Sequence, residues 1–211
     1  MDFPFQIENY HVIERLAVGG MAEIFLAKRM GPAKFQKTVA LKRLLPDIAE
    51  DKAFTAMFLD EARLAAQLHH PNIVQIFDLG ISNGAYFIVM EHLIGKDLSG
   101  VQKQLGLRNA SIEQPLAAKI ISLSADALHY AHTLKDADDQ PLHLIHRDVS
   151  PQNLFLTSNG QVKLMDFGIA KAVRRSVKTE TGVLKGKLAY MAPEQLLGQP
   201  ADQRSDLYAS A

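Results

Sequence analysis

The chain has 211 residues, enough for one domain or for two small packed lobes. Lysine and arginine number 23, as do aspartate and glutamate, so the formal net charge is zero and offers no electrostatic footprint for nucleic acid or an anionic membrane surface. The absence of cysteine excludes disulfides and thiolate metal sites. No apolar run approaches the roughly 20 residues needed to cross a bilayer, and Met1-Asp2 lacks the basic flank of a signal peptide. The sequence therefore predicts no membrane segment and a cytoplasmic location.

Up to Gly95, short apolar runs alternate with turn residues, a pattern typical of strands. The predicted strands cover residues 11–16, 23–27, 38–42, 73–79 and 85–91. A helix is predicted among them over residues 51–68, because apolar or small side chains recur there at helical spacing. Glu61 falls on the same inward stripe of that helix.

Beyond Gly95 the pattern becomes helical. Ser111 and Gln114 have the spacing of a capping box, and Pro115 follows within the first turn. The apolar or small residues that recur down one face are Leu116, Ile120, Leu123, Ala127 and Leu134. This recurrence predicts a long buried helix. A β-rich part followed by an α-rich part predicts an α+β fold in two lobes.

Residues 154–165 predict a hairpin, because Asn159-Gly160 supplies the two positive-φ positions of a tight turn. With these as the two loop residues, Asn153 and Asp166 lie opposite each other, with Cβ atoms roughly 5 Å apart. Both side chains offer oxygen ligands suited to Mg²⁺. Asp148 precedes the hairpin and adds a carboxylate that could act as a base. The alternative for each residue is an ordinary turn cap.

Two further features point to an anionic ligand. A carboxylate on an inward stripe is costly unless a cation meets it, and Lys42, at the end of an apolar strand, is the natural partner for Glu61. The alternative is a surface lysine and a helix glutamate that meet nothing. The small residues of 17–22 let backbone N–H groups approach a phosphate closely. An ordinary glycine-containing hairpin explains that loop equally well.

The order and wording of these segments resemble the signature set of the protein kinases, and look most like the bacterial branch of the eukaryotic-type serine/threonine kinases. The matching segments are Val39-Ala40-Leu41-Lys42, Glu61, His70-Pro71-Asn72-Ile73, His146-Arg147-Asp148-Val149-Ser150-Pro151-Gln152-Asn153, Asp166-Phe167-Gly168, Ala192-Pro193-Glu194 and Asp206-Leu207-Tyr208. The resemblance implies a two-lobed fold, with a β-rich lobe over residues 1–94 and a helical lobe over 95–211. The helical lobe is expected to be incomplete after the start of its central helix, as in a fragment of a longer kinase or in the product of a truncated gene.

The resemblance also implies a phosphoryl-transfer site. Lys42, braced by Glu61, is expected to hold the α- and β-phosphates of ATP. Asn153 and Asp166 are expected to bind Mg²⁺ or Mn²⁺, and Asp148 to orient the substrate hydroxyl and accept its proton. The other residues assigned to the nucleotide are Leu16, Ala17, Gly19, Ile24, Ala40, Met90, Glu91, Leu93, Asp97 and Phe155. An internal column is expected from Ala65, Ile76, His146 and Phe167, for which plain core packing is an equal account.

The chain departs from the family pattern in its glycine-rich loop, where Ala17 and Ala22 occupy the outer glycine positions. We expect a stiffer loop there, because alanine disfavours positive φ. Ser150 replaces the usual lysine of the catalytic loop, and Lys187 replaces the threonine that pairs with it. The segment from Asp166 to Glu194 resembles the activation segment of the family. Lys187 is therefore predicted to reach the catalytic site from this segment.

Regulation is predicted at Thr179 and Thr181, which match paired activation-segment threonines in bacterial relatives. The cations that could receive a phosphate there are Arg147, Lys171, Arg174 and Arg175.

The sequence thus predicts an ATP-dependent serine/threonine protein kinase in signalling. The segment 192–194, with a long loop before it, favours a protein substrate over a small molecule. Tyrosine specificity is disfavoured because the catalytic loop lacks an Ala-Ala-Arg stretch. With Ser150 in place of the usual lysine, however, the loop also lacks the residue typical of serine/threonine kinases. The alternative is a pseudokinase or an inactive truncated fragment that acts as a binding module. No nucleic-acid partner is expected, and a kinase dimer is an assembly that the resemblance allows.

Overall fold

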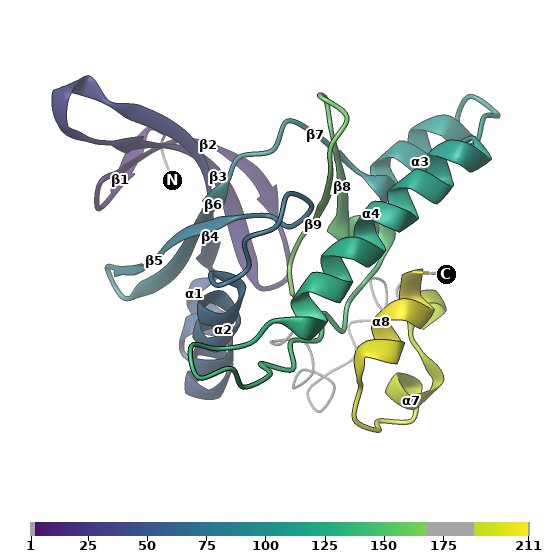
Figure 1. Cartoon of the computed structure of the whole chain (residues 1–211). Coiled ribbons are helices and arrows are strands. Elements are labelled where there is room, and N and C mark those ends of the chain that lie inside the picture. The colour runs from purple at the N-terminus through teal and green to yellow at the C-terminus, as the bar shows by residue number, and fades with distance from the viewer. Residues whose placement is uncertain (1–2, 168–187, 211) are drawn as a thin grey trace. The chain divides into compact units, whose positions relative to one another are not determined.

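The computed structural model describes residues 3–167 and 188–210, and the chain divides into two compact units. The first unit comprises Met1–Gln67 and Gln75–Leu93, and the second comprises Leu68–Val74 and Ile94–Ala211. The first is mainly a sheet and the second mainly helices (Figure 1), which agrees with the predicted α+β class.

The first unit is built on a six-stranded antiparallel sheet of order β1-β2-β3-β4-β6-β5 (Figure 1). Its strands are β1 (Phe5–Ile7), β2 (Tyr10–Val18), β3 (Ala22–Met30), β4 (Gln36–Leu44), β5 (Ile76–Ser82) and β6 (Ala85–Glu91). A 3₁₀ turn, Pro32–Lys34, joins β3 to β4. Four of the predicted strands are confirmed, and each observed strand is as long as predicted or longer. Strand β1 was not predicted, because three residues are too few to show an alternating pattern.

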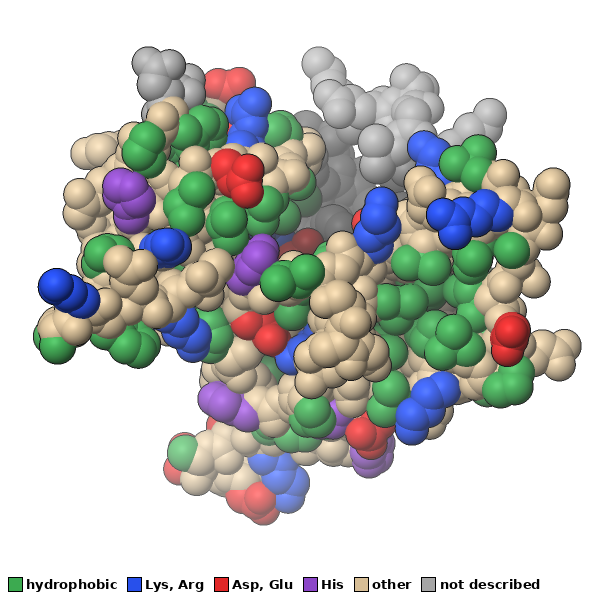
Figure 2. All heavy atoms as spheres, turned by 90° about the horizontal axis from the view of Figure 1, so that it is seen from above, with side chains coloured by type: hydrophobic (Ala, Val, Ile, Leu, Met, Phe, Trp, Pro, Cys, Tyr) green, Lys and Arg blue, Asp and Glu red, His purple; other side chains and the backbone are tan. Residues whose placement is uncertain are grey.

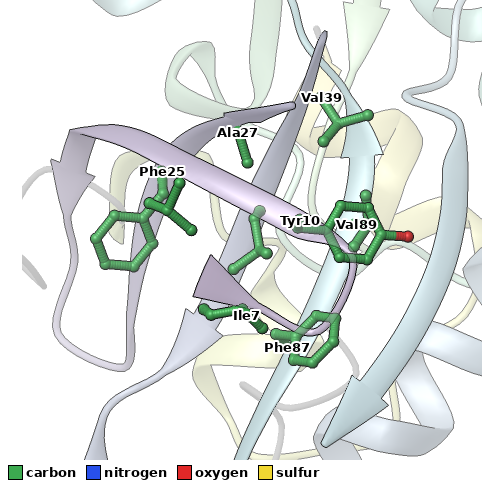
Figure 3. Close-up of a cluster of buried hydrophobic side chains, with 9 residues drawn as sticks. Ile7, Tyr10, Phe25, Ala27, Val39, Phe87 and Val89 are labelled. Carbon is green, nitrogen blue, oxygen red and sulfur yellow. The ribbon is translucent and has the colours of Figure 1, made fainter. Parts of the chain in front are cut away.

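One face of this sheet carries a buried core (Figure 3). The buried cluster is Ile7, Tyr10, Val12, Phe25, Ala27, Val39, Leu41, Phe87 and Val89. Its members alternate along β2, β3, β4 and β6, because successive strand side chains point to opposite faces. The Tyr10 ring meets the Phe87 ring edge-on at 6.0 Å, and its hydroxyl donates a 2.7 Å hydrogen bond to Asp78. Burial, reinforced by that hydrogen bond to a carboxylate, raises the pKa of Tyr10 above its ordinary value.

Two helices complete the first unit: α1 (Pro46–Ala49) and α2 (Lys52–Ala65). Asp51 caps α2, since its carboxylate accepts hydrogen bonds from the N–H groups of Ala53 at 3.0 Å and Phe54 at 3.1 Å. The buried side chains of α2 recur at helical spacing and include Phe54, Phe58, Ala62 and Ala65. The predicted helix over 51–68 is confirmed, with its end three residues earlier. The strand predicted from residue 73 begins only at Ile76; Ile73 instead makes an isolated bridge to Leu164.

The second unit contains a small antiparallel sheet and four described α-helices (Figure 1). The sheet is formed by β7 (Gly95–Asp97), β8 (Leu154–Thr157) and β9 (Val162–Leu164), in the order β7-β8-β9. The helices are α3 (Leu98–Gly106), α4 (Gln114–Thr133), α7 (Pro193–Leu196) and α8 (Gln203–Ser210). Short 3₁₀ turns cover Pro151–Asn153 and Leu188–Tyr190. Helix α4 packs against both α8 and β9.

Helix α4 was predicted correctly, but its capping box was not, and of its predicted apolar face only Ile120 and Ala127 are buried. The helix begins at Gln114, and Glu113 is the N-cap residue, without a side-chain capping bond. Pro115 has no N–H, so the first turn offers fewer donors for a cap to satisfy. Leu116 is 55% exposed. The buried stripe is Ile120, Ser124, Ala127, Leu128 and Ala131, so α4 buries one face only.

The β8–β9 hairpin has a three-residue loop, and its register is one residue away from the prediction. The N–H of Thr157 donates to the carbonyl of Gln161 at 2.9 Å, and the Thr157 hydroxyl accepts the Gln161 N–H at 2.8 Å. Of the loop residues, only Gly160 has a positive φ, at 84°, whereas the predicted turn needs two. Asn153 therefore faces Met165, whose N–H donates to the Asn153 carbonyl at 2.8 Å. Asp166 lies one residue beyond that pair, so the predicted pairing of Asn153 with Asp166 is wrong.

The described surface carries both signs of charge. On the face shown in Figure 2, acidic and basic side chains are interspersed among apolar and neutral ones. Among the described residues, no helix combines the length and the hydropathy needed to span a membrane.

Candidate active site

Residues 146–153 form the loop that is expected to be catalytic, and we call it the catalytic loop. Its backbone is hydrogen-bonded to the carboxylate of Asp206 in α8, a residue that is 1% exposed. Its Oδ2 accepts the N–H of His146 at 2.8 Å, and its Oδ1 accepts the N–H of Arg147 at 2.7 Å. The Nε2 atom of His132 lies 2.7 Å from the same Oδ2. A buried carboxylate is tolerated when hydrogen bonds satisfy it in this way. From the sequence, Asp206 was identified only as part of a motif. Its hydrogen bonds to the loop backbone were not predicted, and neither was the involvement of His132.

His146 is fully buried and links the loop to the end of β9. Its Nε2 lies 2.8 Å from the Met165 carbonyl, and its Nδ1 lies 3.2 Å from the N–H of Asp148. A carbonyl only accepts and a backbone N–H only donates, so the proton must be on Nε2 and the ring is neutral. Burial lowers the pKa of His146, although the nearby charge of Asp206 opposes that effect. The neutral ring therefore fixes the position of Asp148 relative to Met165.

Asn153 and Asp148 are joined directly. The Nδ2 of Asn153 donates hydrogen bonds to the carbonyl and to Oδ2 of Asp148, both at 2.6 Å. Asn153 is 5% exposed and ends the 3₁₀ turn that begins at Pro151, so its side chain is held in place. With the amide nitrogen turned toward Asp148, the amide oxygen is the atom left to bind a cation. An amide oxygen and a carboxylate are oxygen ligands that suit Mg²⁺, so the chemistry of Asn153 and Asp166 fits the cation expected there.

Two residues of this region adopt left-handed backbone conformations without being glycine. Arg147 has φ 64° and Asp166 has φ 51°. Such conformations cost about 1–3 kcal/mol each and cluster at functional sites. The guanidinium of Arg147 also has a buried Nε atom without a hydrogen-bond partner among the described residues. Neither conformation was predicted from the sequence.

Four other residues singled out from the sequence lie in the second unit: Asp97, Ser150, Phe155 and Phe167. Asp97 pairs with Phe155 across β7 and β8, so these two candidate nucleotide residues are neighbours. The Asp97 carboxylate also caps α3 by accepting the Gly100 N–H at 2.7 Å, a structural role that the sequence reading did not foresee. Ser150 is buried, and its hydroxyl donates a long 3.4 Å hydrogen bond to the Asp148 carbonyl. The Phe167 ring packs against the His146 ring at 4.7 Å, as the predicted column requires of that pair.

The candidate phosphate loop joins β2 to β3 and is closed by a 2.9 Å hydrogen bond from the Gly19 N–H to the Ala22 carbonyl. Ala17 pairs with Ile24, and Ala22 pairs with Leu44. Neither alanine has a positive φ. The reason for expecting a stiffer loop therefore does not apply, because this conformation does not need glycine at these positions.

Most of the other residues assigned to the nucleotide in the first unit lie on strands of its sheet. Lys42 lies in β4 opposite Ile24 of β3 and Ile88 of β6, and it is partly buried. Ala40 pairs with Met90. Leu16 lies in β2 and is 45% exposed; Glu61 lies within α2, and Glu91 ends β6, two residues before Leu93. The predictions for Thr179, Thr181 and Lys187, and for the cations Lys171, Arg174 and Arg175, lie outside the described residues.

Further contacts around the site were not predicted. His70 lies 3.2 Å from the Asp126 carboxylate, and its ring stacks on that of Tyr130 at 5.2 Å. Asn72 donates a 2.8 Å hydrogen bond to the Val162 carbonyl. These bonds explain why Leu68–Val74 belongs to the second unit. The His-Pro-Asn segment was the sequence feature from which these contacts could have been predicted. The carboxylate of Glu194 accepts a 2.5 Å hydrogen bond from the Ser205 hydroxyl.

The first unit also contains a cavity of about 500 Å³ that includes none of the candidate residues. Its lining is Phe5, Gln6, Ile7, Arg43, Pro46, Ser82, Asn83, Ala85 and Phe87. Arg43, the charged residue among these, is bound to Glu23 at 2.8 Å. Because that pairing already neutralises Arg43, the cavity gives no argument for a nucleotide.

Comparison with known proteins agrees with this geometry. The family described as "Protein kinase domain" matches residues 10–211. The chain is 50% identical over 200 residues to Tyrosine-protein kinase MasK of Myxococcus xanthus, covering 95% of this chain and 31% of that protein. It is 34% identical to Serine/threonine-protein kinase PrkC of Bacillus subtilis, covering 95% of this chain and 29% of that protein. The chain thus spans about a third of the length of these relatives.

Solved structures give the same result. The Mycobacterium tuberculosis PknI kinase domain superposes with a TM-score of 0.71 at 30% identity, covering all of this chain and 74% of that one. The apo form of PpkA-294 superposes with a TM-score of 0.79 at 20% identity, which shows the fold alone. The expected kinase fold is confirmed, and the chain belongs to the protein kinase domain family.

Proposed function

We propose that this chain is the catalytic domain of an ATP-dependent protein kinase that phosphorylates serine or threonine, with its two lobes over residues 1–94 and 95–211. The observation that carries the proposal is the pair of 2.6 Å hydrogen bonds from Asn153 to Asp148. They orient a carboxylate that can act as a base and leave an amide oxygen for a cation. His146 and Asp206 support the same loop. Membership of the family implies the use of ATP and a divalent metal in general.

In the proposed reaction, the Asp148 carboxylate accepts the proton of the substrate hydroxyl as its oxygen attacks the γ-phosphorus of ATP. A new O–P bond forms, and the bond to the β–γ bridging oxygen breaks. Its electron pair leaves with ADP. Asn153 and Asp166 hold Mg²⁺ or Mn²⁺, which when bound neutralises the phosphate charge. Lys42, braced by Glu61, holds the α- and β-phosphates, with the other residues assigned above around the adenine and ribose.

Tyrosine is the second candidate acceptor, because a relative of 50% identity is named a tyrosine-protein kinase. The relatives PrkC and PknA, at 34% and 37% identity, are named serine/threonine-protein kinases. The loop from Asp148 to Asn153 reads Asp-Val-Ser-Pro-Gln-Asn and lacks an Ala-Ala-Arg stretch. We therefore place serine and threonine first.

Phosphoamino-acid analysis decides between these acceptors. The natural full-length protein is incubated with γ-³²P-ATP, Mg²⁺ and a mixed protein substrate, with Asp148→Asn as the control for contaminating kinases. Labelled phosphoserine or phosphothreonine that Asp148→Asn lacks is the expected result. Phosphotyrosine alone would establish the second candidate. Equal label in both proteins, or none in either, would overturn the proposal in favour of a pseudokinase that acts as a binding module.

Four other parts of the proposal are separately testable. Phosphorylation of Thr179 or Thr181 is checked by mass spectrometry after incubation with ATP. A role for Lys187 in transfer is contradicted if Lys187→Ala keeps the rate within about twofold. A kinase dimer is checked by sedimentation. A cytoplasmic location is proposed because the reaction consumes ATP, and fractionation of cells tests it.

A further inference from the structure

The residue before the candidate base is held at both of its backbone polar atoms by side chains from the C-terminal part of the chain. The N–H of Arg147 donates to Asp206 at 2.7 Å, and the carbonyl of Arg147 accepts a 3.0 Å hydrogen bond from Nε2 of Gln195. Arg147 has φ 64°, which is unfavourable for a side chain with a Cβ. These two bonds offset that cost and keep the residue in one conformation.

Gln195 lies in α7 and is only 6% exposed. Its Oε1 accepts the N–H of Ala192 at 3.1 Å, while its Nε2 donates to Arg147. A carbonyl partner on one side and an N–H partner on the other determine which way the amide points. The Gln195 amide therefore bridges the catalytic loop and the chain that leads into α7.

The bond to Arg147 has a direct consequence for Asp148, because the Arg147 carbonyl and the Asp148 N–H belong to one planar peptide group. Gln195 holds the carbonyl of that group, and Nδ1 of His146 accepts its N–H at 3.2 Å. With both ends held, the plane cannot rotate about the chain direction. The starting direction of the Asp148 side chain is then set before Asn153 binds its carboxylate.

We propose that Gln195 is a positioning residue for phosphoryl transfer. It sets the plane of the peptide that precedes Asp148 and couples that plane, through Ala192, to the segment expected to support a polypeptide substrate. Arg147, Asp148, Ser150, Tyr190 and Gln195 line one small hollow, so the coupled groups are in immediate proximity. This inference rests on the proposed kinase function, since it concerns the same base.

A capping role confined to α7 is the competing explanation for Gln195, and Gln195→Glu separates the two. Glutamate still accepts the Ala192 N–H but cannot donate to the Arg147 carbonyl when ionised. Capping is therefore kept while the link to the catalytic loop is lost. Gln199→Glu is the matched control, because Gln199 is exposed nearby and gains the same charge.

Steady-state kinetics of the full-length protein, together with hydrogen exchange of the peptide around residues 146–149, test the inference. For Gln195→Glu we expect kcat to fall by at least about tenfold, with the KM for ATP within about twofold, because a small misplacement of a catalytic group is costly. Part of the loss should reverse as the pH is lowered, since protonated glutamate can donate again. Faster exchange of the Asp148 amide is expected as well. Gln199→Glu should match the wild type.

A kcat within about twofold of the wild type, with unchanged exchange at Asp148, would overturn the inference. If Gln195→Glu does not fold, Gln195→Met takes its place, which keeps the size of the side chain but makes neither bond; unchanged kcat and unchanged exchange at Asp148 in that variant would overturn the inference. An inactive wild type would refute the proposed function, and the exchange measurement would then decide the positioning claim by itself.

Discussion

Replacing Asp206 by asparagine keeps the size of the side chain but turns one of its two acceptor oxygens into a donor. In the wild type, one oxygen serves the Arg147 N–H and the other serves the His146 N–H and His132. The asparagine nitrogen must therefore face at least one backbone donor. The site is 1% exposed, so water cannot readily replace the lost acceptor.

The size of the effect follows from these contacts. A hydrogen bond to a charged group contributes about 1.5–3 kcal/mol, and an orphaned buried donor costs about 1–3 kcal/mol. One backbone bond lost with its donor left unpaired gives about 3 kcal/mol for local opening of the loop. That is roughly a hundredfold in the opening equilibrium, because each 1.4 kcal/mol is about tenfold.

Hydrogen exchange of the full-length protein, resolved to a peptide covering residues 144–149, measures this opening. Asp206→Asn is expected to reduce protection of the His146 and Arg147 amides by roughly a hundredfold. Asp202→Asn, a substitution one residue before α8 at a side chain that is 47% exposed, should leave the same peptide unchanged. A change of less than about threefold in Asp206→Asn would refute the reasoning that this carboxylate holds the loop.

Two further predictions concern the stability of the fold. Gly80→Ala should destabilise the protein by about 1–3 kcal/mol, because the new Cβ would overlap the Phe87 ring. Gly106→Ala, which has open space around it in α3, should instead stabilise the protein by about 0.5–1 kcal/mol. Calorimetry measures both effects, and equal effects of the two substitutions would contradict this reasoning. The raised pKa of Tyr10 means that folded protein keeps a proton that the unfolded chain loses above about pH 10. Stability should therefore fall as the pH rises past about 10, and Tyr10→Phe should lack that part of the slope; parallel melting profiles would exclude it.

The sequence was sufficient for the elements whose side chains repeat with a regular period. Strand β3 buries the alternate residues Phe25 and Ala27, and helix α2 buries helically spaced residues, so both were predicted to within three residues at their ends. The β8–β9 hairpin shows where this approach fails. Asn159-Gly160 favoured a two-residue turn, but the hydroxyl of Thr157 binds the Gln161 N–H and stabilises a longer loop. A competing side-chain bond of this kind has no periodic signature.

In the candidate site, too, some residues were predicted from the sequence and others were not. Asp148, Asn153 and Asp166 were proposed from a hairpin register that is one residue off and from their resemblance to a known family, and the structure joins the first two directly. The groups that hold them in place were missed. Asp206 and Gln195 act on backbone atoms of residues far away in the sequence, and such contacts depend on tertiary packing.

The magnesium dependence of phosphoryl transfer tests the central claim most directly, namely that Asn153 and Asp166 hold the cation beside Asp148. Rates are measured against Mg²⁺ concentration for the wild type, Asn153→Ala and Asp166→Asn, with the exposed neighbour Gln152→Ala as the control. Loss of an oxygen ligand should raise the half-maximal Mg²⁺ concentration by at least about tenfold in the first two variants and leave Gln152→Ala unchanged. Mg²⁺ dependence and maximal rates that match the wild type in all variants would contradict the account.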